Sequence, residues 1–423
     1  MTTSSKKKKN LLLRFFSVLG PGLITGAADD DPSGIATYST AGAQLGTSLL
    51  WTALLTWPLM AAIQSMCARI GMVTGKGLAG AFRDKFPKWV IATAALALLA
   101  ANTINVGADL SGMSDAAQML TGINSHYFVV IFGIGIAYAT ICFRYHQIAN
   151  TLKWLALVLF AYVITAFIIH PDWKAVVHDT FVPSWPKNRE AWATLVAILG
   201  TTISPYLFFW QASQEVEEEK AMGRRMLYRR QGATHKEIIN RKLDVATGTF
   251  FSNLVMFFII LTTAMTLNKS GLTDIETSAQ AAEALKPLAG AFATTLYTVG
   301  IIGVGLLAIP TLTGSSAYAF AEVFQWRQGL DRKFTSARAF YGVILVSTLV
   351  GIVLDFANVN PVKALFWTAV INGLLAPFLL VGILLVACDS KIMLNQPSSM
   401  LGRIVVGATT IAMFGAAIGM FVF

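Results

Sequence analysis

Charged residues are scarce in this chain of 423 residues: Asp, Glu, Lys and Arg make up 13% of it, whereas about 25% is usual for soluble domains. Hydrophobic residues make up 55%, and the mean hydropathy is +0.62. This composition excludes a water-soluble protein. Because no polar tract separates the apolar runs, we predict a single transmembrane domain over residues 1–423.

Cysteine and histidine are also rare, with three and five copies. The cysteines lie too far apart in sequence to suggest a disulfide framework or a zinc site. The histidines fall in or beside polar connections, and none forms an HExxH-like pair on one helix face. We therefore expect neither a histidine metal centre nor a cofactor.

Apolar runs of about 20 residues, the length that spans a bilayer core of about 30 Å, recur along the chain. Eleven are found, which predicts an all-α polytopic membrane protein. A basic tail at 1–12 precedes the first. The predicted spans are 13–44, 47–70, 90–112, 126–143, 152–170, 191–214, 245–267, 291–324, 338–357, 364–387 and 402–422.

The placement of basic residues predicts the orientation. With the N-terminus in the cytoplasm, 26 of the 32 Lys and Arg lie on the cytoplasmic side and six on the other. The positive-inside rule then favours a plasma-membrane protein with a cytoplasmic N-terminus and, after eleven spans, an extracytoplasmic C-terminus. The net charge of +10 thus reflects topology, and no nucleic-acid partner is expected.

The one highly charged stretch lies at 215–242. Its simplest interpretation is a solvated cytoplasmic loop helix, and the alternative is a role in lipid-headgroup binding or gating. Three further acids, Asp244, Glu322 and Asp355, lie near predicted span ends, where solvation at the interface is expected.

The first span is interrupted by the sequence DDDPSG at 29–34. Three adjacent carboxylates near the bilayer midplane are too costly to serve packing alone. Pro32 lacks an N–H and clashes with the preceding turn, and Gly34 permits unusual dihedral angles, so the helix should unwind here. Unwinding frees carbonyl oxygens that a bound cation can satisfy.

The sixth span repeats this interruption with GTTISPY at 200–206. Unwound segments at matching positions in two halves indicate an inverted-repeat transporter with its site at the midplane. Asp109, in the third span, could sit in a polar cavity or face the outer mouth; the sequence leaves both open.

These motifs resemble the Nramp family of divalent-metal transporters. The similarity rests on GPG at 20–22, DPSG at 31–34, AGAQLG at 41–46 and ARIGMVTGK at 68–76, with weaker echoes in SPY at 204–206, LTG at 312–314 and APF at 376–378. The resemblance implies a LeuT-like fold of two inverted five-helix repeats, here 13–187 and 188–390, plus an eleventh helix at 400–423. It further implies broken helices 1 and 6.

The resemblance also implies a metal site. In the Nramp family this site is formed by the Asp and Asn of a DPGN motif, an Ala carbonyl and a Met thioether. The corresponding positions here are Asp31, Gly34, Thr201 and Ser204. Losing the thioether and the amide favours a hard cation that keeps several waters, as Mg²⁺ does. Asp29 and Asp30 would add negative field around Asp31.

The family pattern also has a His after the sixth-helix Pro and a Glu three residues after an Asp in the third helix. Here those positions are Tyr206 and Gly112, and Asp109 is retained. Without a group that titrates near neutral pH, proton coupling has little to act through. The pattern is closest to the divergent Nramp-related magnesium transporters.

The leading hypothesis is therefore a carrier of Mg²⁺, with Mn²⁺ also accepted, that works by alternating access without proton coupling and is not an enzyme. Its partners would be the cation, as substrate, and the lipid bilayer. One alternative is a proton-coupled Mn²⁺/Fe²⁺ symporter, the ordinary family activity. A sodium-coupled amino-acid carrier is disfavoured because three aspartates would repel a substrate carboxylate. An intramembrane aspartyl protease would need a GxGD-like motif that the chain lacks.

Overall fold

A computed structural model describes residues 20–143, 155–357 and 359–423, and these ranges contain helices and no strands. The basic tail at 1–12, the start of the first predicted span at 13–19 and the start of the fifth at 152–154 lie outside the described residues. Within the described ranges, nine helical stretches are long and apolar enough to cross a membrane. The first and fifth predicted spans appear there as shorter helices.

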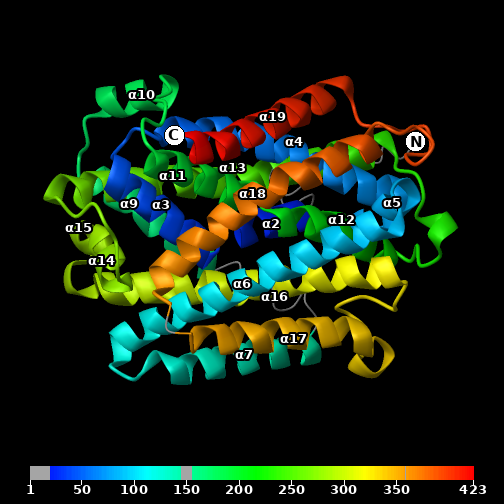
Figure 1. The fold of residues 1–423 in the computed structure, drawn as a ribbon, viewed down its shortest axis with the longest axis horizontal. Helices are drawn as coiled ribbons and strands as arrows, with labels where there is room; N and C mark the ends of the chain where they lie inside the picture. The colour runs from blue at the N-terminus through cyan, green and yellow to red at the C-terminus, as the bar shows by residue number, and fades with distance from the viewer. Residues whose placement is uncertain (1–19, 144–154, 358) are drawn as a thin grey trace, which may run out of the picture.

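The longer helices follow one another in the predicted order, and most have boundaries close to those expected (Figure 1). They are α2 (Pro21–Asp29), α3 (Pro32–Leu45), α4 (Leu50–Thr74), α6 (Lys88–Thr121), α7 (Ser125–Cys142), α9 (Phe160–Ile168), α11 (Arg189–Thr202), α12 (Pro205–Ala221), α13 (His235–Thr266), α16 (Ala293–Phe324), α17 (Arg338–Asp355), α18 (Pro361–Ala387) and α19 (Met400–Val422).

Short helices in the connections were not predicted. They comprise α5 (Leu78–Lys85), α10 (Trp173–Phe181), α14 (Ser278–Ala282) and α15 (Lys286–Ala289), with 3₁₀ turns at Leu227–Arg229, Asn268–Ser270, Glu283–Leu285, Gly290–Phe292 and Phe334–Ser336. A further 3₁₀ turn, Leu155–Leu159, leads into α9 within the predicted fifth span. The pieces in the connections are too short to carry a clear apolar period, so hydrophobicity does not predict them.

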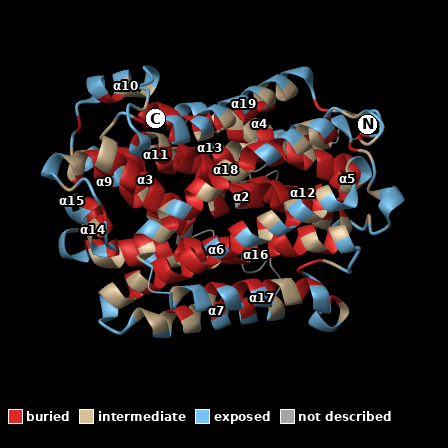
Figure 2. Ribbon diagram, viewed as in Figure 1, coloured by how far each residue is buried: buried red, intermediate tan, exposed pale blue. Residues whose placement is uncertain are grey.

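The broken helices lie at the centre of the molecule. Figure 2 shows α2, α3, α11 and α12 mostly buried, whereas α7, α17 and α19 lie at the edges and carry exposed residues. Those exposed residues include Ile131, Ile134, Val346, Leu349 and Ile411, which are apolar. Large exposed apolar side chains on outer helices are what a lipid-facing surface requires.

Close helix approaches hold the two broken helices against their neighbours. A Cβ built on Gly26 of α2 would lie 2.3 Å from the carbonyl oxygen of Gly248 in α13. A Cβ built on Gly200 of α11 would lie 2.3 Å from the backbone nitrogen of Gly373 in α18. Glycine at these crossings lets the backbones touch, as small residues do between membrane helices.

The α13 helix begins ten residues before the predicted start of the seventh span. Thr234 caps it: the Thr234 hydroxyl accepts from the Glu237 N–H, and the Glu237 carboxylate accepts in return from the Thr234 N–H. This reciprocal capping starts the helix within the charged stretch at 215–242, before the apolar run begins.

Candidate functional site

The first break lies where the sequence predicted it. α2 ends at Asp29, α3 begins at Pro32, and Asp31 is the N-cap residue of α3. The Asp31 Oδ1 atom accepts a hydrogen bond of 2.7 Å from the Gly34 N–H, and its Oδ2 atom accepts one of 3.2 Å from the Asn105 amide of α6. Asp31 is only 2% exposed, so this conformation encloses its carboxylate.

The second break places α11 against the start of α3. α11 ends at Thr202 and α12 begins at Pro205. A Cβ built on Gly34 would lie 3.2 Å from the Thr201 hydroxyl oxygen and 3.4 Å from the Asp31 Oδ1 atom. The fold thus brings Asp31, Gly34 and Thr201 together, although 170 positions separate the first from the last.

Ser204 closes the C-terminal end of α11. Its hydroxyl oxygen lies 2.6 Å from the Thr201 carbonyl oxygen and 2.8 Å from that of Gly200. One hydroxyl proton serves one of these acceptors at a time, so the second carbonyl retains free acceptor capacity. The end of α11 therefore offers the Ser204 hydroxyl oxygen and one free backbone carbonyl oxygen, that of Gly200 or Thr201.

Asp29 and Asp30 point toward another helix. Both lie near the Ser252 hydroxyl of α13, at 2.6 Å from Asp29 Oδ2 and 3.1 Å from Asp30 Oδ1. They are 0% and 4% exposed. One hydroxyl proton cannot satisfy both buried carboxylates at once, and both carboxylates lie within two residues of Asp31.

Asp109 is buried and lies one turn from Asn105 on α6, so the outer-mouth position does not apply. Residues four apart share a helix face, and Asn105 contacts Asp31, so Asp109 belongs to the same polar region. In the described residues, neither Asp109 carboxylate oxygen makes a hydrogen bond of ordinary length, and the Ser33 N–H at the start of α3 is the backbone donor that interacts with this carboxylate.

The two positions that carry His and Glu in the family pattern have structural contacts here. The Tyr206 hydroxyl donates a 2.8 Å hydrogen bond to the Ala28 carbonyl and ties α12 to the end of α2. A Cβ built on Gly112 would lie 2.8 Å from Leu365 Cδ1, so α18 occupies the space of a larger side chain.

The atoms near Asp31 that could act as metal ligands are oxygens: its own carboxylate, hydroxyls and backbone carbonyls. In the described parts of the chain, no three His, Cys, Asp or Glu side chains gather as a ready-made metal cage. Such a donor set suits hard cations and lacks the sulfur or imidazole that softer metals favour. A strongly hydrated ion needs few direct protein ligands.

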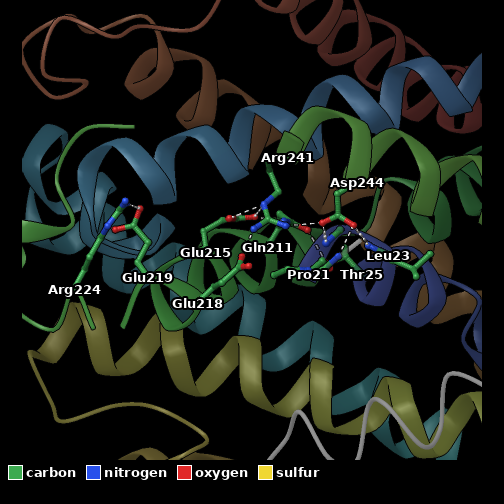
Figure 3. A network of polar contacts seen from close by, with 12 residues as sticks. Pro21, Leu23, Thr25, Gln211, Glu215, Glu218, Glu219, Arg224, Arg241 and Asp244 are labelled. Atoms are coloured by element: carbon green, nitrogen blue, oxygen red, sulfur yellow. Dashed lines mark hydrogen bonds and ion pairs between the residues drawn. The ribbon is translucent and has the colours of Figure 1, made fainter. Parts of the chain in front are cut away.

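A polar network holds the opposite end of α2 (Figure 3). Gly20, at its N-cap, has no side chain to cap the helix, and Asp244 of α13 takes over this role. The Asp244 carboxylate accepts from the N–H groups of Gly20, Gly22 and Leu23 at 2.8, 2.8 and 3.1 Å. A carboxylate at a helix N-terminus both satisfies free N–H groups and opposes the helix dipole.

Arg241 connects this cap to α12. It lies 2.5 Å from Asp244 and 2.7 Å from Glu215, and it also pairs with Glu218. Gln211 donates to Glu215 and lies 2.7 Å from the Thr25 hydroxyl, which closes the network back onto α2 (Figure 3).

The burial of these acids corrects two expectations. Glu215 and Glu219 are 1% and 3% exposed, so the stretch at 215–242 is not a fully solvated loop helix. Asp244, expected at a solvated span end, is 0% exposed. Glu322 is also buried and accepts from the N–H groups of Gly77 and Gly80, which caps α5. Ion pairs and backbone donors replace the expected solvation.

Asp355 likewise has protein partners at the far end of α17. Its carboxylate accepts a 2.5 Å hydrogen bond from the Ser111 hydroxyl of α6 and lies 2.6 Å from the His126 ring. This contact joins α6, α7 and α17 near one end of the bundle.

Comparison with known proteins identifies the family. Residues 22–423 match the family model for Nramp, natural resistance-associated macrophage protein-like. The chain belongs to the Nramp family. This Nramp protein is 25% identical over 418 residues to a divalent metal cation transporter MntH of Caldanaerobacter subterraneus, covering 95% of this chain and 93% of the relative. It is 28% identical over 308 residues to the MntH of Yersinia enterocolitica, covering 70% and 71%.

Solved structures confirm the predicted fold class for this Nramp protein. An Eremococcus coleocola manganese transporter superposes with a TM-score of 0.77 at 17% identity, covering 98% of this chain and 88% of that one. MhsT, solved in complex with L-phenylalanine, gives a TM-score of 0.57 at 13% identity, covering 95% of this chain and 97% of that one. The LeuT-like arrangement with broken helices 1 and 6 is therefore established.

Three polar residues that contact the acids of the first break or hold α2 were not predicted. Asn105 contacts Asp31, Ser252 contacts Asp29 and Asp30, and Gln211 joins the network at α2. Asn105 lies four residues before Asp109 in an apolar span, a spacing that could have indicated it. Nothing local distinguishes Ser252 from a serine that packs between helices.

Proposed function

We propose that this Nramp protein, a divalent-metal transporter of the MntH type for which the metal ion is substrate, carries Mg²⁺ and also accepts Mn²⁺. The observation that carries the proposal is that the candidate metal ligands around Asp31, where the two helix breaks meet, are oxygen atoms. Asp31 would contact the cation directly. Thr201, Ser204 and the backbone beside Gly34 would hold it directly or through its waters.

Helix dipoles support a cation at this point. α2 and α11 end here, and the carbonyl ends of helices carry partial negative charge. α3 and α12 begin here with partial positive charge, which the Asp31 carboxylate opposes. Negative charge on Asp29 and Asp30 would raise the local cation concentration further.

Transport would proceed by alternating access, in which α2 and α12 move to open one side of the site. The conformation described here encloses Asp31, and the Arg241 network holds α2 against α12 and α13. Release of this network would expose the site to the side predicted to be cytoplasmic. The proposed repeats remain 13–187 and 188–390, with 400–423 as the extra helix.

We further propose that no proton accompanies the metal. Tyr206 hydrogen-bonds the Ala28 carbonyl, and Leu365 fills the space beside Gly112, so neither position offers a group that titrates near neutral pH. The second candidate is a proton-coupled Mn²⁺/Fe²⁺ symporter. The buried carboxylate of Asp109, which interacts with Asp31 and with the Ser33 N–H, favours it, as does similarity to proteins named as manganese and divalent metal transporters.

Steady-state accumulation in proteoliposomes separates the two candidates. With a potassium diffusion potential of about −60 mV, an uncoupled dication carrier should accumulate Mg²⁺ about 100-fold. This ratio should not change when a pH gradient is imposed. A symporter that moves one proton per metal ion would change it by about tenfold per pH unit and acidify the lumen, and that result would refute uncoupled transport.

The role of Asp31 is tested in the same vesicles. Asp31→Ala removes the carboxylate that caps α3 and should abolish saturable Mg²⁺ uptake. Asp179→Ala, on α10 near the exposed surface, is the matched control and should transport normally. Equal uptake by Asp31→Ala and the parent protein, at equal reconstitution, would remove the basis of the proposed site.

A further inference from the structure

A large cavity lies at the ends of α12 and α16, on the face predicted to be cytoplasmic. It has a volume of about 760 Å³ and is formed by α5, the end of α12, the connection from α12 to α13, and the connection from α16 to α17. Ligand-binding pockets typically measure about 300–1,000 Å³. The cavity is therefore large enough for a small organic ligand or a lipid headgroup.

Basic side chains dominate its wall. Seven Lys and Arg and three carboxylates line it, a formal excess of four positive charges. Lys220 is paired with Glu217 across 2.8 Å. The other six come from three separate stretches of the chain: Lys76, Arg83, Arg225, Arg230, Arg327 and Arg332.

None of these five arginines forms an ion pair in the part of the chain that the structure describes, and three of the five, Arg225, Arg327 and Arg332, are exposed. Glu322, which also lines the cavity, is engaged by the N–H groups of Gly77 and Gly80 and by Gln328. Partial burial lowers the pKa of Arg230 despite its acidic neighbours.

The positive-inside rule accounts for basic residues on this face but not for their convergence on one hollow. Like charges brought together repel, so the arrangement is costly unless an anion occupies it. The positive charge of this wall would also repel a divalent cation that leaves the transport site on this side. A planar guanidinium matches the paired oxygens of a phosphate better than those of a monovalent ion such as chloride.

We propose that this cavity is a binding site for a phosphate-bearing anion, held by Arg225, Arg327 and Arg332. Trp326, which lines the cavity and stacks on Phe324, offers an apolar face for a base or the edge of a lipid headgroup. The anion would bridge the loop after α12 to the loop after α16. Because α12 begins beside Ser204, occupancy would restrain one half of the broken helix.

Calorimetry on the full-length protein in detergent tests whether a soluble phosphate-bearing anion binds in the cavity. ADP is titrated in metal-free buffer with a chelator, so that the transported cation plays no part. We expect one saturable site whose affinity falls steeply with added KCl. The combined variant Arg225→Gln/Arg327→Gln/Arg332→Gln should bind at least about tenfold more weakly, because it loses charge-assisted hydrogen bonds.

A matched variant distinguishes specific binding in the cavity from non-specific attraction of ADP to the basic surface. Lys236→Gln/Lys242→Gln/Lys391→Gln removes the same charge from exposed positions on the same predicted face, outside the cavity. It should bind ADP within about twofold of the parent protein. Equal weakening in both variants would refute the proposal.

The lipid source is tested by native mass spectrometry after reconstitution with phosphatidic acid. Retention of this lipid by the parent and the lysine variant, with loss in the arginine variant, would support the site and assign it to a headgroup. If neither ADP nor phosphatidic acid distinguishes the two variants, the proposal fails. Neither readout depends on transport, so failure here leaves the proposed Mg²⁺ transport untouched.

Discussion

At the N-terminus of α3, Asp31 has two roles that use different oxygens of one carboxylate. Oδ1 accepts from the Gly34 N–H and begins the helix, and Oδ2 accepts from Asn105. Each oxygen keeps a further lone pair for a cation or one of its waters. The same residue thereby fixes the break and supplies the proposed ligand, so replacing it by Asn would preserve the cap while removing charge.

Three residues around Asp31 should decide metal preference. Gly34→Asn and Ser204→Met would introduce the amide and thioether of the family pattern, and Thr201→Ala would remove the hydroxyl 3.2 Å from the new Cβ at position 34. We expect the triple variant to shift uptake from Mg²⁺ toward Mn²⁺ by about tenfold in their ratio, because a soft donor favours later metals. Competition of the two ions for uptake measures this.

Gly34→Asn/Ser204→Met without Thr201→Ala serves as the control. The Asn side chain then meets the Thr201 hydroxyl, so this double variant should transport poorly. An unchanged Mg²⁺ to Mn²⁺ ratio in an active triple variant would show that selectivity is set elsewhere.

At the scale of elements, two helices with glycine N-caps borrow a carboxylate from another helix. Asp244 of α13 caps α2, and Glu322 of α16 caps α5. A helix whose own sequence caps it can move independently, whereas these two are tied to their neighbours. In α2, the Asp244 contact holds the N-terminal end of the helix, which would have to be released from α13 during alternating access.

Asp244→Asn should loosen α2. It removes the charge that holds Arg241 and at least one N–H acceptor, worth about 1.5–3 kcal/mol for bonds to a charged group. Backbone amides of residues 20–25 should then exchange hydrogen at least about tenfold faster, as measured by mass spectrometry. Glu237→Gln changes the same charge on α13 without touching α2 and should leave these amides protected; equal exchange in both variants would contradict the cap.

A surface ion pair links α5 to the connection between α18 and α19. Lys85 lies 2.6 Å from Asp389 and, with the Ile392 N–H, holds the pKa of that carboxyl below its ordinary value. A lowered folded-state pKa stabilises the fold above the unfolded-state pKa, and the gain is lost as pH falls through the folded value. Lys85→Gln should therefore lower the Tm slightly at pH 7. This difference should begin to shrink near pH 4 and vanish once the pH is below the lowered folded-state pKa of Asp389.

Lys88→Gln is the control for this pair. Lys88 is exposed, and no ion pair involves it in the part of the chain that the structure describes. Its effect on the Tm should be independent of pH between about 3 and 7. A Lys85→Gln effect that persists in acid would mean that the pair does not act through Asp389.

At the scale of the whole molecule, the distribution of basic residues predicts the orientation of every helix. With an odd number of spans, the two termini should lie on opposite sides. Green fluorescent protein at the N-terminus and alkaline phosphatase at the C-terminus should both be active when expressed in a bacterium. An inactive phosphatase, with a C-terminal green fluorescent protein that is fluorescent, would refute the eleven-span topology.

Much of the architecture followed from local chemistry. Proline and glycine beside polar residues predicted both helix breaks within a few residues, since a missing N–H ends a helix wherever it occurs. Hydrophobicity alone predicted the start of α13 ten residues too late. The Thr234 and Glu237 capping pair in the sequence marks the true start of this helix.

The surroundings of the acidic residues depended on tertiary structure. Asp244, Glu322 and Asp355 were expected at solvated span ends, and each instead has partners from a distant part of the chain. The division of three consecutive carboxylates, with Asp31 toward α6 and Asp29 and Asp30 toward α13, could not be predicted either.

The sequence by itself determined the membrane class, the order of the helices, the positions of the two breaks and the residues nearest to them. Each of these depends on composition, on period along one helix or on the backbone limits of proline and glycine. Only the tertiary structure decided that Thr201 lies beside Gly34, that Asp244 caps α2 and that arginines from separate loops converge on one cavity. Such contacts join segments far apart in the chain, and the packing of whole helices sets them.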